Sequence, residues 1–486
     1  MFILIVFLLS FSCISYGAAV HEYPIVIVIP SRNNVDVCKK NLTSVFAQTY
    51  KNYRVIYIDD ASDDGTYEAV CSYITQQQGW HRVLMVRNEQ RQGSLYNQFR
   101  AIHTCKNNEI IVILDGDDAL MPNALSVINA AYQDDQVWMT YGQYREDPTG
   151  KAGHCKNIPY VVKINQAYRY YDWVTSHPRT FYAGLFKQIP LGYLLYEDGF
   201  QPSAIDLATM FSMLELSNGR FHFIDEVLYL YNCANPNNIF KKNLLTQLTM
   251  NYSTRGRKPL QALSFDPRTI NQSSAHVTVG MIVLSDNNPK QLAALLDQLD
   301  ATRVACDEVR VVYMAKDYDT CLAYLDVFER HPFVRMQPVA ASDGLKASLL
   351  ALCQMKRYSH IVLMLDTTPI EHIHDVKQCV NLLEKTHACG FYFNVASQDK
   401  VRTVPSTLCN TMPPLVPLEQ DVYAWQFKHA AGKWQLPYTC DGALYRAQDL
   451  QEAIALCLFN TGADLCCALQ FLKAPGHEDV GLCFML

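Results

Sequence analysis

The chain has 486 residues, of which 49% are hydrophobic and 18% charged, so it is long enough for two or three folded domains and lacks the composition of a disordered protein. Its formal net charge of −6, with no basic run, argues against a nucleic-acid partner. The 17 cysteines include no CxxC pair and many stand among helical apolar positions, so they do not predict a disulfide-stapled fold.

The N-terminus, MFILIVFLLSFSCISYGAAV, is an apolar run that ends in small residues. This pattern predicts a signal peptide over residues 1–19, with an uncleaved anchor as the alternative. No later stretch is apolar and long enough to span a bilayer. We therefore expect the secretory route, ending in the periplasm, a lumen or outside the cell. Weak support for a lumen comes from three glycosylation sequons, which begin at Asn41, Asn251 and Asn271.

Strands and helices are predicted to alternate through the first half of the chain. The predicted strands are YPIVIVIP at 23–30, YRVIYIDD at 53–60, RVLMVRN at 82–88 and EIIVILDGDD at 109–118. Helical spacing of apolar residues separates them. This alternation predicts a parallel, doubly wound sheet, in which ligands bind at the carboxyl ends of the strands.

The polar segment 253–275 predicts a linker, after which the pattern restarts. HVTVGMIVLSDNN resembles PIVIVIPSRNN, and YSHIVLMLDTTP resembles NEIIVILDGDD, so residues 276–486 are expected to hold a second copy of the domain. An alignment by these letters matches Asp366 with Asp115. It places other residue types at the remaining acidic positions: Lys316 for Asp60, Thr368 for Asp117 and Pro369 for Asp118.

Two predicted neighbouring strands of the first half end in acids. Asp60 ends one, and Asp115, Asp117 and Asp118 follow the other, with Gly116 allowing a tight turn. Carboxylates this close repel one another unless a cation sits among them. The spacing therefore predicts a Mn²⁺ or Mg²⁺ site, and the alternative is a solvated acidic turn that caps the next helix.

The segments IVIVIPSRNN, YRVIYIDDASDDGT, RQGSLYNQFRAI and IVILDGDDAL, in this order, resemble the glycosyltransferase family 2 pattern on the GT-A fold, over about residues 23–232. The resemblance implies an α/β fold with two GT-A-like (Rossmann-like, mostly parallel sheet) domains in tandem. The first, 20–252, would be catalytic and the second, 276–486, degenerate.

The same resemblance implies a site for a nucleotide sugar. Asp60 would contact the nucleobase, and the backbone at Pro30 and Ser31 would line the nucleoside. Gly93 would lie where the donor approaches, although packing of the following helix explains that region equally well. The ribose, the diphosphate and the metal would be contacted by the three remaining acids, which are Asp115, Asp117 and Asp118.

An inverting transfer also needs a carboxylate base for the acceptor hydroxyl. Asp206, which starts an amphipathic helix, fits that part of the family pattern, and the Glu197–Asp198 pair is the alternative. A helix-terminal acid favoured by the helix dipole would explain Asp206 without catalysis. Arg179 could pair with the diphosphate or an acid, or simply hold a loop.

The sequence therefore predicts a metal-dependent transferase that moves a sugar from a nucleotide-diphosphate sugar to a hydroxyl of a glycan, lipid or protein. The expected donor is a UDP-sugar. One rival is a non-catalytic glycan-binding protein on the same scaffold. The other is a sugar nucleotidyltransferase, which would usually show a glycine-rich phosphate loop after the first strand, where SRNNVDVCKK has no glycine.

Overall fold

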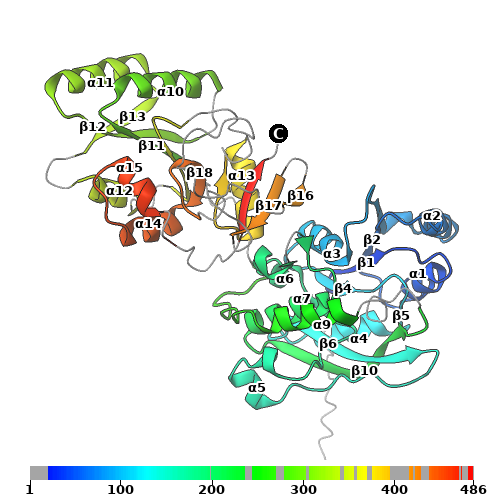
Figure 1. Ribbon diagram of the computed structural model, residues 1–486. Coiled ribbons are helices and arrows are strands. Elements are labelled where there is room, and N and C mark those ends of the chain that lie inside the picture. The colour runs from blue at the N-terminus through cyan, green and yellow to red at the C-terminus, as the bar shows by residue number, and fades with distance from the viewer. Residues whose placement is uncertain are drawn as a thin grey trace, which may run out of the picture.

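The structure is a computed structural model, and it forms two α/β domains in tandem (Figure 1). The predicted signal peptide, the Glu197–Asp198 pair and the sequon at Asn271 lie outside the described residues. The described residues are 20–196, 199–235, 244–269, 278–302, 306–339, 344–354, 358–368, 375–393, 415–419, 422–427, 437–469, 472 and 480–484.

The first domain is built on an eight-stranded sheet with the order β3-β2-β1-β4-β7-β6-β10-β5. Four strands predicted from the sequence are its parallel part: β1 (Ile25–Ser31), β2 (Tyr53–Asp59), β3 (Val83–Arg87) and β4 (Ile110–Ile113). Every residue of β1 and β4 is buried, because helices cover both faces of a parallel sheet and favour continuous apolar strands.

The helices of this parallel part connect its strands, as the sequence predicts. They are α1 (Cys38–Phe46), α2 (Thr66–Gln76) and α3 (Ser94–His103), and a fourth helix, α4 (Ala124–Ala131), follows the acidic turn after β4. Their apolar residues recur at helical spacing, and Leu42 and Val45 of α1 are fully buried. The strand order β3-β2-β1-β4 places the carboxyl ends of β1 and β4 side by side. The chain leaves β1 toward β2 on one side of the sheet, and β4 lies on the other side of β1.

Beyond β4 the sheet becomes mixed. β7 (Arg179–Tyr182) lies antiparallel to both β4 and β6 (Met139–Asp147). The long β10 (Phe221–Asn232) is parallel to β6 and antiparallel to the short β5 (Ala119–Leu120). This arrangement carries residues from distant parts of the chain to the end of β4.

Shorter elements fill in the rest of the domain. They are α5 (Tyr160–Ile164), α6 (Ala183–Phe186), α7 (Ile205–Ser217), α9 (Leu244–Arg255), β8 (Leu195–Tyr196), β9 (Gly199–Phe200) and the 3-10 turns η1 (Gly79–His81), η2 (Tyr168–Tyr170) and η3 (Leu191–Tyr193). A buried ion pair between Arg169 and Glu215, with Nε–Oε1 at 2.6 Å, fastens η2 to α7.

The segment predicted as a linker is partly packed structure. Helix α9 runs to Arg255, inside the predicted bounds of 253–275. Beyond it, the backbone N–H of Leu260 donates to Glu215 and that of Leu263 donates to the carbonyl of Leu216. Local polarity and proline content gave no sign of these contacts, because they depend on a partner helix distant in sequence.

The second domain repeats the topology of the first. Its nine-stranded sheet has the order β13-β12-β11-β14-β18-β15-β19-β17-β16, again with four parallel strands followed by an antiparallel one. The strands are β11 (Val279–Asp286), β12 (Glu308–Met314), β13 (Val334–Pro338), β14 (His360–Leu365), β15 (Phe391–Tyr392), β16 (Val416–Glu419), β17 (Val422–Gln426), β18 (Asp441–Arg446) and β19 (Val480–Phe484).

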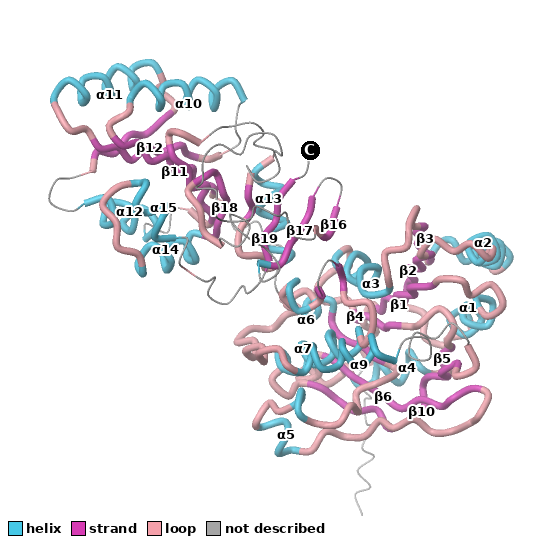
Figure 2. The backbone as a smooth tube through the Cα atoms, viewed as in Figure 1, coloured by secondary structure: helices cyan, strands magenta, loops and turns pink. Residues whose placement is uncertain are grey.

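Helices lie on both sides of this second sheet. Figure 2 places α10 (Pro289–Thr302) and α11 (Tyr318–Arg330) on one side of β11 and β12. On the other side lie α12 (Gly344–Gln354), α14 (Ala447–Leu456) and α15 (Gly462–Leu469). A further helix, α13 (Val376–Thr386), follows β14. The internal repeat expected from the sequence is thus present as a repeated strand order.

The register of the two sheets corrects the alignment of their acidic turns by one residue. In the first domain Val28 pairs with Ile113, and the N–H of Asp118 donates to the carbonyl of Asp115. In the second domain the same turn bond joins Thr368 to Leu365. The positions of Asp115, Gly116, Asp117 and Asp118 are therefore taken by Leu365, Asp366, Thr367 and Thr368.

The same reasoning moves the counterpart of Asp60. Ser31 pairs with Asp59, and Ser285 pairs with Tyr313, so Met314 rather than Lys316 takes the place of Asp60. At the matching strand ends, the second domain therefore has none of the four acids of the first. It has one new acid, Asp366, where the first domain has Gly116.

The two domains touch near α3. The hydroxyl of Tyr96 donates to the carbonyl of Leu418 at 3.5 Å, and His387 Nε2 lies 3.0 Å from the carbonyl oxygen of Lys187. Buried apolar residues of both domains belong to one continuous core. Within the described residues, no helix is long and apolar enough to cross a membrane.

Candidate active site

A side chain of α1 holds the turn after β4 by hydrogen bonds. The side-chain amide of Asn41 donates to the carbonyl oxygens of Asp115 and Asp118, at 3.0 and 2.8 Å. Asn41 is completely buried, so it cannot accept a glycan in the folded protein and its sequon has a structural explanation. These bonds fix the backbone from which the acidic side chains project.

Gly116 permits a very close approach of the turn to β1. A Cβ atom at this position would lie 2.4 Å from Ser31 Oγ and 2.9 Å from Asn34 Nδ2. Ser31 is itself buried and accepts a hydrogen bond from Asn34 Nδ2. Ser31, predicted to line a nucleoside, therefore also holds the ends of β1 and β4 together, and Pro30 precedes it in the same buried strand.

Asp118 is buried and both of its carboxylate oxygens accept hydrogen bonds. Tyr229 donates its hydroxyl to Oδ2, and Asn232 donates its backbone N–H to Oδ1, each at 2.7 Å. Burial raises the pKa of Asp118 well above its ordinary value, and the charges of Asp117 and Asp115 raise it further. A cation in this position would favour the ionised form.

Asp115, Asp118 and His177 form a cluster that could hold a metal ion. One potential ligand atom from each lies within 4.8 Å of the others. The His177 ring stacks on Tyr229, with centroids 4.4 Å apart. Burial, followed by the charge of Arg179, lowers the pKa of His177 well below its ordinary value, so the ring is neutral, as a metal ligand must be.

Asp117 does not belong to this cluster in the described residues, although the sequence predicted it as a ligand. Its Oδ2 accepts a 2.6 Å hydrogen bond from the side chain of Asn235. Burial raises the pKa of Asp117, and the charge of Asp115 adds to that effect. The carboxylate thus stays beside the cluster while holding the chain that follows β10.

Arg179 places a positive charge at the acidic edge, which is formed by Asp115, Asp117 and Asp118 after β4. Its Nη2 donates to Asp115 Oδ2 at 3.2 Å, and its side chain is almost entirely buried. The buried Nε has no hydrogen-bond partner among the described residues. Burial opposes the charge, but Asp115 and Asp206 raise the pKa of Arg179, so it remains protonated. An orphaned buried donor beside carboxylates suits an anionic ligand.

Asp206 lies in the first turn of α7, as predicted, and faces the same cluster. Its Oδ1 accepts the backbone N–H of Leu207 at 3.0 Å. Burial raises the pKa of Asp206; Arg179 opposes this shift and Asp115 reinforces it. A carboxylate with a raised pKa is a better proton acceptor, which is what a general base requires. The alternative pair Glu197–Asp198 lies outside the described residues.

Asp60 organises the loop before α3. Its carboxylate accepts hydrogen bonds from the backbone N–H groups of Gln92 and Gly93, at 2.8 and 2.9 Å, and from Asn88 Nδ2 at 2.8 Å. Gly93 has a φ of +92° and a Cβ there would meet open space. Burial works against the charge of Asp60, yet the bonds from Gln92, Asn88 and Gly93 lower its pKa overall.

We expect Asp60→Asn to destabilise the protein by about 1.5–3 kcal/mol, because an amide cannot accept both backbone N–H bonds. Since folding lowers the pKa of Asp60, its contribution is present above the unfolded pKa of about 3.9 and is lost as the pH falls below it. Urea unfolding at pH 7 and at pH 3 would measure this. The difference between wild type and variant should shrink at pH 3, and an equal difference at both values would contradict it.

The sequence reasoning missed His177. The residue stands two positions before Arg179 in HPRTF, in a bend that precedes β7. Its nearness to Arg179 in the sequence is the signal that points to His177. Tyr229 and Asn232 were not predicted as part of the site either, and their bonds to Asp118 give them a structural role there.

Comparisons with known proteins find similarity to glycosyltransferases over part of the first domain. Residues 26–188 match the family model described as glycosyl transferase family 2. A β-1,3-glucosyltransferase of Escherichia coli, WfgD, named for UDP-Glc and α-D-GlcNAc-diphosphoundecaprenol, is 26% identical over 123 residues, covering 25% of this chain and 46% of that protein. Hyaluronan synthase of Streptococcus pyogenes is 26% identical over 137 residues, covering 28% of this chain and 32% of the synthase.

The chain spans less than half the length of these curated relatives. Among solved structures, S. aureus TarS 1–349 in complex with UDP-GlcNAc is similar with a TM-score of 0.34 and 15% identity, covering 44% of this chain and 59% of that one. The strand order and the family match together carry the assignment. Residues 26–188 therefore form a glycosyl transferase family 2 domain.

Proposed function

We propose that the protein is a metal-dependent glycosyltransferase that moves a sugar from a nucleotide-diphosphate sugar to a hydroxyl acceptor with inversion. The observation that carries the proposal is the convergence of Asp115, Asp118, His177, Arg179 and Asp206 at the carboxyl end of β4. A pure binding protein would not need a base with a raised pKa beside a metal cluster and a buried cation.

The cluster fits a divalent ion. Carboxylate oxygens keep free lone pairs after accepting one hydrogen bond each, and the imidazole of His177 is neutral. Two carboxylates with one imidazole suit Mn²⁺ at least as well as Mg²⁺. When bound, such an ion would neutralise the negative charge that develops on the departing diphosphate. Asp115, Asp118 and His177 would hold it, with Asp117 beside them.

The protein's own groups supply the remaining steps. Asp206 takes the proton of the acceptor hydroxyl while that oxygen attacks the anomeric carbon from the face opposite the diphosphate. Arg179, held against Asp115, pairs with the diphosphate through its free Nε. The strand ends at Pro30 and Ser31 and the loop that Asp60 organises form the nucleoside side of the site.

The donor is inferred to be a UDP-sugar, in line with the E. coli relative that is named for UDP-Glc. The acceptor would be a hydroxyl of a glycan, a lipid or a protein. We also propose domain bounds of 20–252 for the catalytic domain and 276–486 for the degenerate one. A signal peptide over residues 1–19 would lead the protein into the secretory route.

A panel of nucleotide sugars, with product detection after chelation and after addition of Mn²⁺ or Mg²⁺, tests the proposal. We expect transfer or hydrolysis of one donor to stop on chelation and to return with Mn²⁺, more fully than with Mg²⁺, because one ligand is an imidazole. Asp115→Asn should lower the rate by about a hundredfold at saturating donor.

Asp172→Asn is the matched control, because Asp172 is 79% exposed and lies in the same domain, and it should behave as wild type. Asp117→Asn separates enzyme from binder. If no donor in the panel reacts with any metal, or if Asp117→Asn leaves both transfer and hydrolysis unchanged, a non-catalytic glycan-binding protein is the better description.

A further inference from the structure

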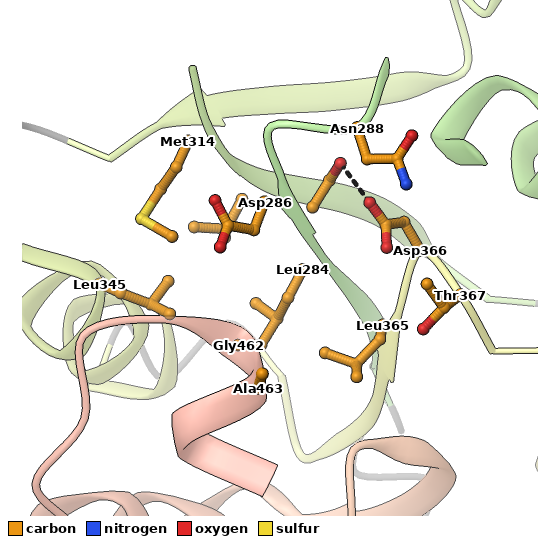
Figure 3. A pocket seen from close by; sticks show the side chains of 12 residues that line it. Leu284, Asp286, Asn288, Met314, Leu345, Leu365, Asp366, Thr367, Gly462 and Ala463 are labelled. Carbon is orange, nitrogen blue, oxygen red and sulfur yellow. Dashed lines mark hydrogen bonds between the residues drawn. The ribbon is translucent and has the colours of Figure 1, made fainter. Parts of the chain in front are cut away.

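The second domain contains a cavity of about 200 Å³ at the carboxyl ends of β11, β12 and β14 (Figure 3). It lies between β11 and β14, the place in this strand order where ligands bind in doubly wound sheets. Gly462 at the start of α15 closes one side, and a Cβ there would lie 3.1 Å from Leu365. The proposed transfer reaction makes no use of this cavity.

The charge of the lining disfavours an anionic ligand. Asp286 and Asp366 line the cavity, and no Lys, Arg or His is among its described lining residues. Asp366 is only 6% exposed, and its Oδ2 accepts a 2.6 Å hydrogen bond from Ser285. Carboxylates held in this way repel a phosphate group and attract N–H and O–H donors.

The apolar wall favours an unsaturated ring. Leu284, Leu345 and Leu365 face the cavity, together with the thioether of Met314, which makes favourable contacts with unsaturated rings. The volume lies below the roughly 300–1,000 Å³ of pockets for drug-sized ligands. It therefore suits a base with its ribose better than a whole nucleotide sugar.

We propose that this cavity binds a neutral nucleoside, without a diphosphate and without a metal. The register supports this division of the site. Ser285 keeps the position and residue type of Ser31, and Met314 takes the position of Asp60. Leu365, Thr367 and Thr368 replace the three acids that serve the diphosphate side in the first domain. The comparison of the two sides rests on the proposed function of the first domain, whereas the cavity and its lining stand without it.

The test is a titration of the full chain, carrying ¹³C-methyl-labelled methionines, with uridine in the presence of EDTA. Met314 reports on the cavity, and its signal is assigned with Met314→Leu. Uridine should shift that signal with a millimolar dissociation constant. Ala463→Trp, at an exposed cavity-lining position in the first turn of α15, should weaken binding by about tenfold or more. Ala455→Trp, at an exposed position on α14 outside the lining, is the matched control.

UDP and glucose are titrated in parallel. Because of the two carboxylates, UDP should need a higher concentration than uridine to move the Met314 signal, and glucose should leave it unchanged. An unmoved Met314 signal at the solubility limit of uridine overturns the proposal. So does stronger binding of UDP, or a response to glucose alone. Loss of transferase activity would leave this readout intact, so the two proposals fail separately.

Discussion

Asp206→Asn is expected to lower kcat by about 10²–10⁴-fold, with little change in the KM for the donor. The carboxylate lies in the first turn of α7, where burial raises its pKa and the charge of Arg179 partly offsets that rise. An amide of the same shape retains the packing but cannot accept the acceptor's proton. Steady-state kinetics with the donor identified by the panel, together with thermal unfolding, would measure both effects.

The control for this variant is Asp319→Asn. Asp319 is also an acid in the first turn of a helix, α11, but it is exposed and lies in the second domain. It should keep full activity. If Asp206→Asn instead retains kcat and loses only thermal stability, Asp206 serves the helix dipole and the base must be sought elsewhere, first at Glu197 or Asp198.

Gly116→Ala should reduce activity by about a hundredfold and stability by about 1–3 kcal/mol. The added methyl group would lie 2.4 Å from Ser31 Oγ and 2.5 Å from Ser31 Cβ, so the turn or the end of β1 must shift. Asp115 and Asp117 flank the glycine, and any shift displaces both acids. Activity and the free energy of unfolding measured in urea should therefore both decrease, whereas Asp206→Asn should lower activity alone.

Gly199→Ala is the matched control, because a Cβ at Gly199 meets nothing within 4 Å. It should leave both quantities near the wild-type values. Normal activity in Gly116→Ala would mean that the acidic turn tolerates displacement, which is incompatible with a site that depends on placed carboxylates.

The parallel part of the first sheet was predictable because its strands are buried on both faces. Such strands appear as uninterrupted apolar runs, and IVIVIPS and IIVI leave little choice. The mixed part was not predicted. β6, with the sequence MTYGQYRED, mixes apolar and polar residues without a clean period, and its pairing with β10 links segments far apart in the chain.

The site was predictable to the extent that strand ends carry its acids. The carboxylates of Asp115 and Asp118 converge as expected, whereas Asp117 is held by Asn235, a contact that spans 118 positions. The one-residue error at the second acidic turn had a simple cause. Matching letters paired Asp366 with Asp115, but backbone hydrogen bonds decide register, and they place Asp366 at the position of Gly116.

The contact of Tyr96 with Leu418 has a practical consequence for production of the protein. Tyr96 is only 8% exposed, and the apolar core runs on from one domain into the other. A fragment truncated after the first domain would uncover that surface to water, next to the helix whose leading loop grips Asp60. We expect such a fragment to self-associate and to have a less ordered loop before α3. Biochemical work is therefore best begun on the full-length chain.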